Sequence, residues 1–449
     1  MRGRGAQQPN IIVFFSDQQR WDTLGCYGQA LDVTPNLDRM AQEGVRFERA
    51  FTPQPVCGPA RACLQTGKYA TETGCVRNKI GLRVGEKTLA HWLSEAGYEV
   101  GYIGKWHLAP TTEERNYTTV AVPPEYRGGY KDYWLVSNKI EFTSHGYGGH
   151  VFDGEGRQVD FEGYRVDCLT DFALDYLRSR DGVRPFFLFL SFLEPHQDVG
   201  HKRFEGPIGS QERFRNYEVP GDLVGAEGDW RESYPDYLGS CASLDYNLGR
   251  LRSELERLGM AENTVVIYTT DHGCHFRTRN AGYKVSCHES SIRIPLIACG
   301  PGFRGGKVVK ELVSLLDVQA TLLAVAGVPR PPTVRGRPLG ELVTGGVADW
   351  PQEVFVQVSG SHFGRAIRTE RWKYSVWVPG EQPGSSRAEA RSDIYYEQCL
   401  YDLESDPYER NNLVCDAALE RVRAGLAEVL KRRMAEAGES VAEILPAKG

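Results

Sequence analysis

The chain has 449 residues, of which 41% are hydrophobic and 25% are charged, so it can bury a substantial core and is neither a disordered tail nor a small disulfide-stapled scaffold. Its net charge of −6 gives no reason to expect binding along a nucleic-acid backbone, and we predict no nucleic-acid partner. No apolar run reaches the roughly 18 residues that a membrane-spanning helix needs, so we predict no membrane partner either.

Most of the chain alternates short apolar runs with amphipathic segments. Residues 10–16 are mainly β-branched and aromatic, which is typical of a buried parallel strand. Residues 237–258 carry leucines at every third or fourth position, the spacing of one helix face. The glycine- and tyrosine-rich stretch 113–158 has little periodicity and predicts a long loop region over the site. In chain order, we predict strands over 10–16, 99–103, 186–192, 264–270 and 292–299, and helices over 34–44, 88–96, 237–258 and 312–326.

The composition changes near residues 329–338, which are rich in proline, arginine and glycine and predict a linker. The pattern as a whole predicts an α/β fold: a large mixed, mostly parallel sheet sandwiched by helices, followed by a smaller C-terminal α+β subdomain that contains an antiparallel sheet. The predicted units are a catalytic domain over 1–345 and a subdomain over 346–449, with strands at 354–358, 365–378 and 398–403 and a helix at 416–437.

Polar and charged side chains recur directly after the predicted strands. Open α/β sheets bind their ligands along the edge that the carboxyl ends of the strands form, so we expect these side chains to assemble one site from distant segments. They are Asp17, Gln18, Lys105, His107, His196, Asp271 and His272.

The sharpest local pattern is Cys57-Gly-Pro-Ala-Arg61. A cysteine ahead of a proline predicts a turn that leads into a helix, and both the helix N-terminus and the nearby guanidinium would favour an anion there. On its own, this pentapeptide is equally consistent with a buried structural cysteine in a proline turn.

The stretch from Cys57 through Thr66-Gly67 resembles the sulfatase signature Cys-x-Pro-x-Arg, in which the cysteine is converted to formylglycine; the fourth position is Ala60 here, where that family more often has serine. This resemblance to formylglycine-dependent sulfatases of the alkaline phosphatase superfamily spans most of the first 300 residues. It implies an alkaline-phosphatase-like fold and a sulfuric ester hydrolase. The further motifs follow in the family's order: Pro9-Asn10, Gly25-Cys-Tyr-Gly28, Thr34-Pro-Asn-Leu37, Gly104-Lys-Trp-His107, Pro195-His196, Asp271-His-Gly273 and Glu289 through Arg293-Ile-Pro295.

A divalent metal site is predicted at four of these positions. Asp17, Gln18 and Asp271 offer the hard oxygen ligands that Ca²⁺ or Mg²⁺ prefers, although the family more often has two aspartates where Asp17-Gln18 stands. His272 occupies a position where the family has Asn or His, and its nitrogen also admits Mn²⁺. Taken alone, Asp17 and Gln18 could instead be ordinary turn residues after a strand. We predict Ca²⁺, with Mn²⁺ or Mg²⁺ as alternatives.

The resemblance also implies roles around the sulfate group. Arg61 would orient the nucleophile, and Lys105 and Lys284 would hold sulfate oxygens. His107 would hydrogen-bond the formylglycine hydroxyl, and His196 would act as general acid toward the leaving alcohol. A formylglycine made from Cys57 requires a formylglycine-generating or sulfatase-maturing enzyme as a partner.

The segment after the predicted metal residues is rich in basic and aromatic side chains, which suit a sugar that carries anionic groups. Its alternative interpretation is a solvated basic loop. The predicted substrate-binding residues are His275, Arg277, Arg279 and Tyr283.

The favoured function is removal of sulfate from a sulfated carbohydrate or a related small-molecule or oligosaccharide sulfate ester. One alternative is a phosphonate monoester or phosphodiester hydrolase of the same superfamily, which this chain also resembles in Cys-Gly-Pro-Ala-Arg and in the Asp-Gln pair. Another is a non-catalytic glycan-binding relative.

The 11 cysteines are an odd number without a framework spacing, which predicts mostly reduced, buried thiols. No hydrophobic signal segment is evident at the start of the chain. We therefore predict a cytoplasmic protein as the sequence is given, or a periplasmic or secreted one if a leader was removed.

Overall fold

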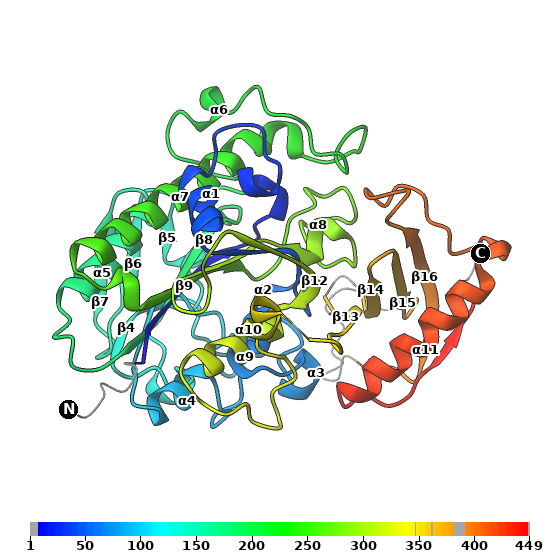
Figure 1. The fold of residues 1–449 in the computed structure, drawn as a ribbon. Coiled ribbons are helices and arrows are strands. Elements are labelled where there is room, and N and C mark those ends of the chain that lie inside the picture. The colour runs from blue at the N-terminus through cyan, green and yellow to red at the C-terminus, as the bar shows by residue number, and fades with distance from the viewer. Residues whose placement is uncertain (1–7, 346, 361, 381–390, 448–449) are drawn as a thin grey trace.

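The computed structural model describes residues 8–345, 347–360, 362–380 and 391–447, so residues 1–7, which bear on the prediction of a leader, lie outside the described residues. Five parallel strands form the centre of a twelve-stranded sheet, in the order β9-β1-β8-β3-β4 (Figure 1). Their bounds are β1 Asn10–Asp17, β3 Glu99–Lys105, β4 Tyr133–Ser137, β8 Phe186–Pro195 and β9 Thr264–Thr270.

The sheet is mixed because antiparallel strand pairs flank its parallel centre at both edges. Next to β9, strand β11 runs antiparallel to β9 and to β2, while β12 pairs parallel with β2. At the other edge, β6 is antiparallel to β4, β5 and β7. These edge strands are β2 Val45–Phe51, β5 Ser144–His145, β6 Gly148–Phe152, β7 Gln158–Glu162, β10 Arg293–Ile294, β11 Leu296–Cys299 and β12 Lys307–Ser314.

Helices cover both faces of the large sheet (Figure 1). Strand β1 shows why: Ile11 and Val13 pack into the apolar cluster beneath α2, α4 and α9, while Ile12 and Phe14 pack beneath α1, α5 and α7. Successive side chains of a strand point to opposite faces, so a strand that is apolar throughout must be covered twice. The helices over these faces are α1 Pro35–Glu43, α2 Cys57–Thr66, α4 Leu89–Glu95, α5 Arg165–Arg178, α7 Trp230–Arg257, α9 Leu315–Val325 and α10 Gly340–Thr344, and the shorter helices are α3 Ala70–Thr73, α6 Ser210–Arg213 and α8 Glu289–Ile292.

A smaller five-stranded sheet follows, with the order β13-β14-β15-β16-β17. Helix α11 packs on it through Leu430 and Met434, and the same apolar cluster includes Leu316 of α9. The predicted α/β architecture with a C-terminal antiparallel sheet is thus confirmed, whereas the exact division at 345/346 stays a prediction. The bounds are β13 Glu353–Val358, β14 Gly364–Thr369, β15 Trp372–Trp377, β16 Ile394–Asp402, β17 Glu443–Leu445 and α11 Glu420–Glu436.

Several local predictions are wrong. The stretch 113–158 is not one long loop, because it contains β4, β5 and β6; these strands are short and rich in glycine at their edges, so their alternation is weak. Helix α7 begins at Trp230, seven residues before the predicted start, and contains Pro235.

Three further predicted elements are each divided in two. The predicted strand 292–299 is interrupted at Pro295, between β10 and β11. The predicted helix 312–326 begins as strand β12, and Ser314 caps α9 by accepting a hydrogen bond from the backbone N–H of Leu316. Residues 365–378 form the hairpin β14–β15 rather than one strand. In the described part of the chain, no helix is both long and apolar enough to cross a bilayer.

Gly104 allows β3 and β8 to approach closely just before Lys105. Its φ is +97°, and a Cβ there would lie 1.9 Å from the carbonyl oxygen of Ser191 on β8. We expect Gly104→Ala to lose about 2 kcal/mol or more of unfolding free energy relative to Gly97→Ala, because overpacking adds to the strain of a positive φ. Gly97 is the matched control, since its φ is +92° and nothing lies within 4 Å of its added Cβ. Urea unfolding of both variants measures the difference; equal losses would contradict this account.

Candidate active site

The structure brings the predicted residues to one edge of the large sheet. Asp17 ends β1 and Lys105 ends β3, while His196 follows β8 and Asp271 follows β9. Cys57 is the first residue of α2 and is 1% exposed. The carboxyl ends of four parallel strands therefore meet the amino end of one helix.

The side chain of Cys57 lies among candidate metal ligands and a cation. Its Sγ is 3.5 Å from Asp17 Oδ1, 3.3 Å from His272 Nε2 and 2.7 Å from Lys284 Nζ. Burial, followed by the negative charge of Asp17, raises the pKa of the thiol to about 12. The unmodified side chain is thus an uncharged thiol at neutral pH rather than a thiolate nucleophile.

Arg61 joins the two carboxylates. Its Nη2 is 3.0 Å from Asp17 Oδ2, its Nε is 3.2 Å from Asp271 Oδ2, and its Nη1 donates to Ser191 Oγ at 2.7 Å. Lys105 adds a second cation, with Nζ 2.9 Å from Asp17 Oδ2. All of these side chains are buried, so the site holds closely spaced charges away from water.

The two carboxylates titrate differently. Burial alone would raise the pKa of Asp17, but Lys105, His196 and Arg61 together hold it well below the ordinary value. Burial and the neighbouring Asp17 carboxylate raise the pKa of Asp271 to about 7. A pair of carboxylates this close needs added positive charge to ionise fully, which a divalent cation would supply.

The residues fit a divalent metal. Asp17, Cys57, Asp271 and His272 each place one ligand atom within 4.8 Å of the others. Gln18 joins them: its backbone N–H donates to Asp271 Oδ1 at 3.0 Å, and its Oε1 is buried with no hydrogen-bond partner in the described part of the chain. Two carboxylates and an unpaired buried amide oxygen are oxygen donors of the kind that a hard cation takes.

Two histidines at the site are neutral in the folded protein. Burial and Lys284 lower the pKa of His196 to about 3, and its Nδ1 lies 2.8 Å from the carbonyl oxygen of Gln197. Burial and Lys105 hold the pKa of His107 well below its ordinary value. Within the described residues neither ring nitrogen of His107 has a hydrogen-bond partner. His107 therefore keeps free hydrogen-bonding capacity in a buried position.

The predicted substrate-binding residues lie in different surroundings. His275 is fully buried, with Nε2 3.0 Å from the carbonyl oxygen of Lys284. Arg279 donates to the backbone carbonyls of Tyr408 and Glu409, which ties this segment to the C-terminal region.

The other two contact each other, with Tyr283 buried beneath the more exposed Arg277. Arg277 is about half-exposed; its guanidinium lies 4.8 Å from the centre of the Tyr283 ring and 3.5 Å from Asp229. Tyr283 donates to the same aspartate at 2.6 Å. A binding role for the four residues stays a prediction.

Sequence reasoning missed three residues that contact this site. Glu141 lies 3.4 Å from Lys105 Nζ, and its position in the stretch first interpreted as loop gave no signal. Asn78 caps α2 by accepting a hydrogen bond from the N–H of Gly58 at 2.9 Å. Ser191, the hydroxyl that Arg61 contacts, could have been noticed as the polar residue inside the apolar run of β8.

The burial of His275 can be tested through the pH dependence of the free energy of unfolding. Burial lowers its pKa to about 4, below the ~6.5 of an unfolded histidine. The unfolded chain then takes up this proton at a higher pH, so the free energy of unfolding falls as the pH drops from about 6.5 toward 4. We expect His275→Gln to lose part of this dependence in urea unfolding series across that range. The half-exposed His201→Gln is the control, and a wild-type slope in His275→Gln would refute the account.

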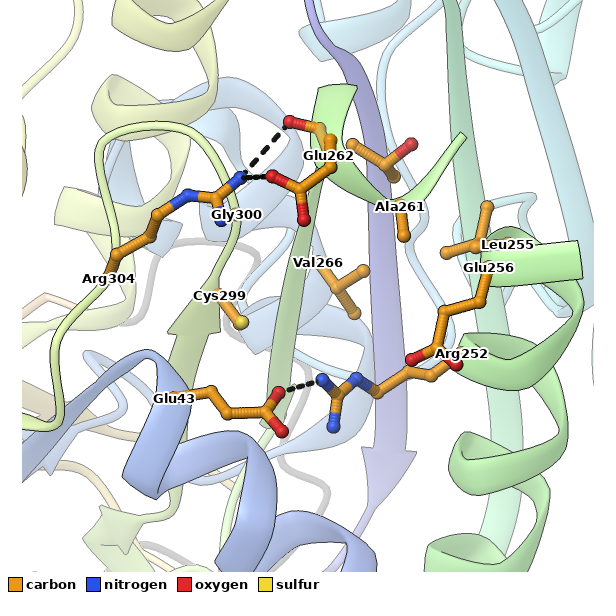
Figure 2. Close-up of a pocket in the computed structure, with 11 residues that line it drawn as sticks. Glu43, Arg252, Leu255, Glu256, Ala261, Glu262, Val266, Cys299, Gly300 and Arg304 are labelled. Carbon is orange, nitrogen blue, oxygen red and sulfur yellow. Dashed lines mark hydrogen bonds and ion pairs between the residues drawn. The ribbon is translucent and has the colours of Figure 1, made fainter. Parts of the chain in front are cut away.

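A separate cleft lies at the opposite end of the sheet, next to Thr264 at the start of β9, and has a volume of about 430 Å³ (Figure 2). Two ion pairs lie along it: Arg304 with Glu262 at 2.7 Å, and Arg252 with Glu43. Because ligands of parallel α/β sheets bind at the carboxyl ends of the strands, this cleft is not a candidate for the active site.

Relatives identified by sequence extend over nearly the whole chain. It is 28% identical over 449 residues to an ulvan-active sulfatase of Formosa agariphila, covering 96% of this chain and 82% of that protein. It is 25% identical over 515 residues to an N-acetylglucosamine-6-O-sulfatase of Bacteroides thetaiotaomicron, covering 95% and 86%.

Solved structures support the fold. The YidJ sulfatase structure from Bacteroides fragilis has a TM-score of 0.81 at 22% identity, with 98% of both chains covered. The phosphonate monoester hydrolase of Agrobacterium radiobacter has a TM-score of 0.73 at 22% identity, with 96% of both covered. At these identities, the likeness shows the fold alone.

Two family models match the sequence. The model described as N-sulphoglucosamine sulphohydrolase, C-terminal, matches residues 283–436. The model described as Sulfatase matches residues 9–328, which is more than half of the chain. The chain therefore belongs to the sulfatase family of hydrolases, and the prediction of a sulfatase is confirmed.

Proposed function

We propose that the protein removes sulfate from a sulfated carbohydrate, using a formylglycine made from Cys57 and a divalent cation held by Asp17, Gln18, Asp271 and His272. The observation that carries the proposal is the position of Cys57: its Sγ lies 3.5 Å from a carboxylate of the candidate metal site and 2.7 Å from Lys284 Nζ. The residue that the family motif marks for conversion thus faces both the metal ligands and a cation.

A hydrated formylglycine at residue 57 would offer a hydroxyl, and a divalent cation held by Asp17, Gln18, Asp271 and His272 would lower the pKa of that hydroxyl and make it a nucleophile. Lys105 and Lys284 hold sulfate oxygens and stabilise the charge that develops on them. Arg61 keeps the two carboxylates in place and balances their charge.

The histidines handle protons and hydrogen bonds. His107 holds the hydroxyl of residue 57 with its free ring nitrogen, and His196 faces the leaving oxygen. The neutral state of His196 in the folded protein means that it must gain a proton from solvent before it acts as an acid.

Sulfated glycans are the proposed substrate class. Two relatives are named for such activities, one as ulvan-active and one for N-acetylglucosamine 6-O-sulfate. A sugar that carries further anionic groups suits the segment with His275, Arg277, Arg279 and Tyr283. Among these four, Arg277 is about half-exposed, so it is the first to test.

We expect Arg277→Ala to raise KM for a sulfated oligosaccharide about tenfold and to change kcat little, because it removes a charge contact made equally in the ground and transition states. Arg304→Ala, which removes an arginine paired with Glu262 in the cleft at the opposite end of the sheet, is the control. Unchanged steady-state kinetics in Arg277→Ala would discard its binding role.

The function is tested by peptide mass across Cys57 in protein produced together with a formylglycine-generating or sulfatase-maturing enzyme. The expected peptide has the thiol replaced by an aldehyde, and this material hydrolyses aryl sulfate. An unmodified thiol in fully active protein would refute the mechanism. Faster cleavage of an aryl phosphonate monoester than of the aryl sulfate would favour the phosphonate hydrolase. Protein with an unmodified Cys57 that binds sulfated glycan without turnover would favour the glycan-binding alternative.

The metal is tested separately. Treatment with a chelator should abolish turnover, and re-addition of Ca²⁺, Mg²⁺ or Mn²⁺ one at a time identifies the cation that restores it. Full activity in protein shown by elemental analysis to be metal-free would remove the metal from the proposal.

A further inference from the structure

A second group of possible metal ligands lies where the two sheets meet. Cys287 and His288 directly precede α8, and Cys399 lies on β16 of the C-terminal sheet. One ligand atom from each of the three residues lies within 4.8 Å of the other two. Cys287 is 3% exposed and Cys399 is 7% exposed, so both sulfurs are buried.

The two thiols lie within hydrogen-bond reach of each other, but the polar atoms of this group are only partly satisfied. Both cysteines are free thiols rather than a disulfide. His288 Nε2 lies 3.2 Å from the hydroxyl of Tyr401, whereas its Nδ1 is buried with no hydrogen-bond partner among the described residues. Tyr401 in turn donates weakly to Cys399 Sγ, at 3.7 Å. A buried imidazole nitrogen without a partner, next to two thiols, needs an explanation.

We propose that Cys287, His288 and Cys399 bind a zinc ion. Two thiolates and one imidazole are the soft and borderline ligands that Zn²⁺ takes in tetrahedral sites, whereas Ca²⁺ and Mg²⁺ require oxygen. Zinc bonds of about 2.3 Å to sulfur and about 2.0 Å to nitrogen place tetrahedral ligand atoms roughly 3.5 to 3.8 Å apart, and the ligand atoms of this group lie within 4.8 Å of one another. We take Nδ1, the ring nitrogen without a partner, as the zinc ligand; the hydrogen bond of Nε2 to Tyr401 then gives the support that zinc-bound histidines usually have.

The charges nearby are consistent with a thiolate site. Lys373 Nζ lies 2.7 Å from Glu409 Oε1 and also pairs with Glu289, so these carboxylates already have a cation. The two thiolates themselves balance the charge of one Zn²⁺. The remaining coordination position is left for a water molecule.

The ion would connect the catalytic segment to the C-terminal sheet. Cys287 lies three residues after Lys284, whose Nζ contacts Cys57. Zinc would therefore fix the start of α8, and the chain leading to it, against β16. This inference concerns a site apart from the active-site cation and does not depend on the reaction proposed above.

The test counts zinc in the full chain with Cys57→Ala, which removes the active-site thiol as a competing ligand. The protein is purified under reducing conditions, loaded with Zn²⁺ and desalted over a weak chelator in excess Ca²⁺. We expect elemental analysis to find one zinc per chain. Adding Cys399→Ser should remove it, whereas adding Cys241→Ser, at another buried cysteine, should not.

Two further measurements keep the result decisive if Cys399→Ser folds poorly. Cobalt-loaded Cys57→Ala protein should show the strong visible absorption of tetrahedral cobalt thiolate, and His288→Ala should weaken zinc binding roughly tenfold or more with both thiols in place. The proposal is overturned if Cys57→Ala retains no zinc, if a well-folded Cys399→Ser variant retains it, or if peptide mass shows a Cys287–Cys399 disulfide.

Discussion

A Cys57→Ala variant should fold normally and lose sulfate-ester hydrolysis by about 10⁴-fold or more, because the proposed nucleophile is made from this side chain alone. The side chain makes no ion pair that the fold needs, and its loss removes only a thiol next to Asp17, His272 and Lys284. The measurement is kcat/KM on an aryl sulfate with protein from cells that contain the maturing enzyme, together with the unfolding midpoint.

The matched control for this variant is Cys63→Ala, which removes a second buried thiol from the same helix, outside the site. It should keep turnover close to the wild-type rate. Comparable activity in Cys57→Ala and Cys63→Ala would exclude residue 57 as the source of the nucleophile.

An Arg61→Ala variant should lose both stability and activity. Arg61 is 2% exposed and contacts the carboxylates of Asp17 and Asp271, so its removal leaves two buried acids close together. Breaking a buried ion pair by deleting one partner costs about 3 to 5 kcal/mol. We expect that loss in urea unfolding of metal-free protein, with turnover reduced by at least about 10²-fold because residue 57 and its ligands lose their positions.

The comparison for Arg61 is Arg49→Ala, which removes an arginine paired with the exposed Glu370. Surface pairs contribute about 1 kcal/mol or less, so this variant should stay near the wild type. Equal losses in the two variants would show that Arg61 is an ordinary ion-pair partner and not the centre of the carboxylate arrangement. Added metal should recover part of the lost stability in Arg61→Ala, since the cation binds the same carboxylates.

The sequence predicted the fold class because its strongest patterns are local. A run such as Ile11 to Phe15 is apolar at every position, and only a strand covered on both faces buries all of it. The sequence missed the elements whose local pattern is weak. Strand β4 mixes half-buried and buried positions in a run of only five residues, and β6 begins with two glycines, so neither stands out from a loop.

The residues of the candidate site likewise fall into those that the sequence predicted and those that it missed. Residues at strand ends and in the Cys57 motif were found, because chain position or a recognisable motif marks them. Glu141 and Asn78 were not, because each contacts the site from an irregular segment without any sequence signal. Arg279 illustrates the reverse: its charge suggested substrate binding, whereas the fold joins it to backbone carbonyls of the C-terminal region.

By itself, the sequence determined the layered α/β architecture and the family, and it marked Cys57 as the residue proposed for conversion, since periodicity and short motifs are properties of neighbouring residues. Only the tertiary structure decided which charges share a buried volume: that Arg61 lies between two carboxylates, that the Gln18 amide oxygen is left without a partner, and that Cys287 and Cys399 lie close enough for one ion. Such proximity arises from packing of distant segments, and the free energy of bringing charges and thiols together depends on the separation and burial that packing sets.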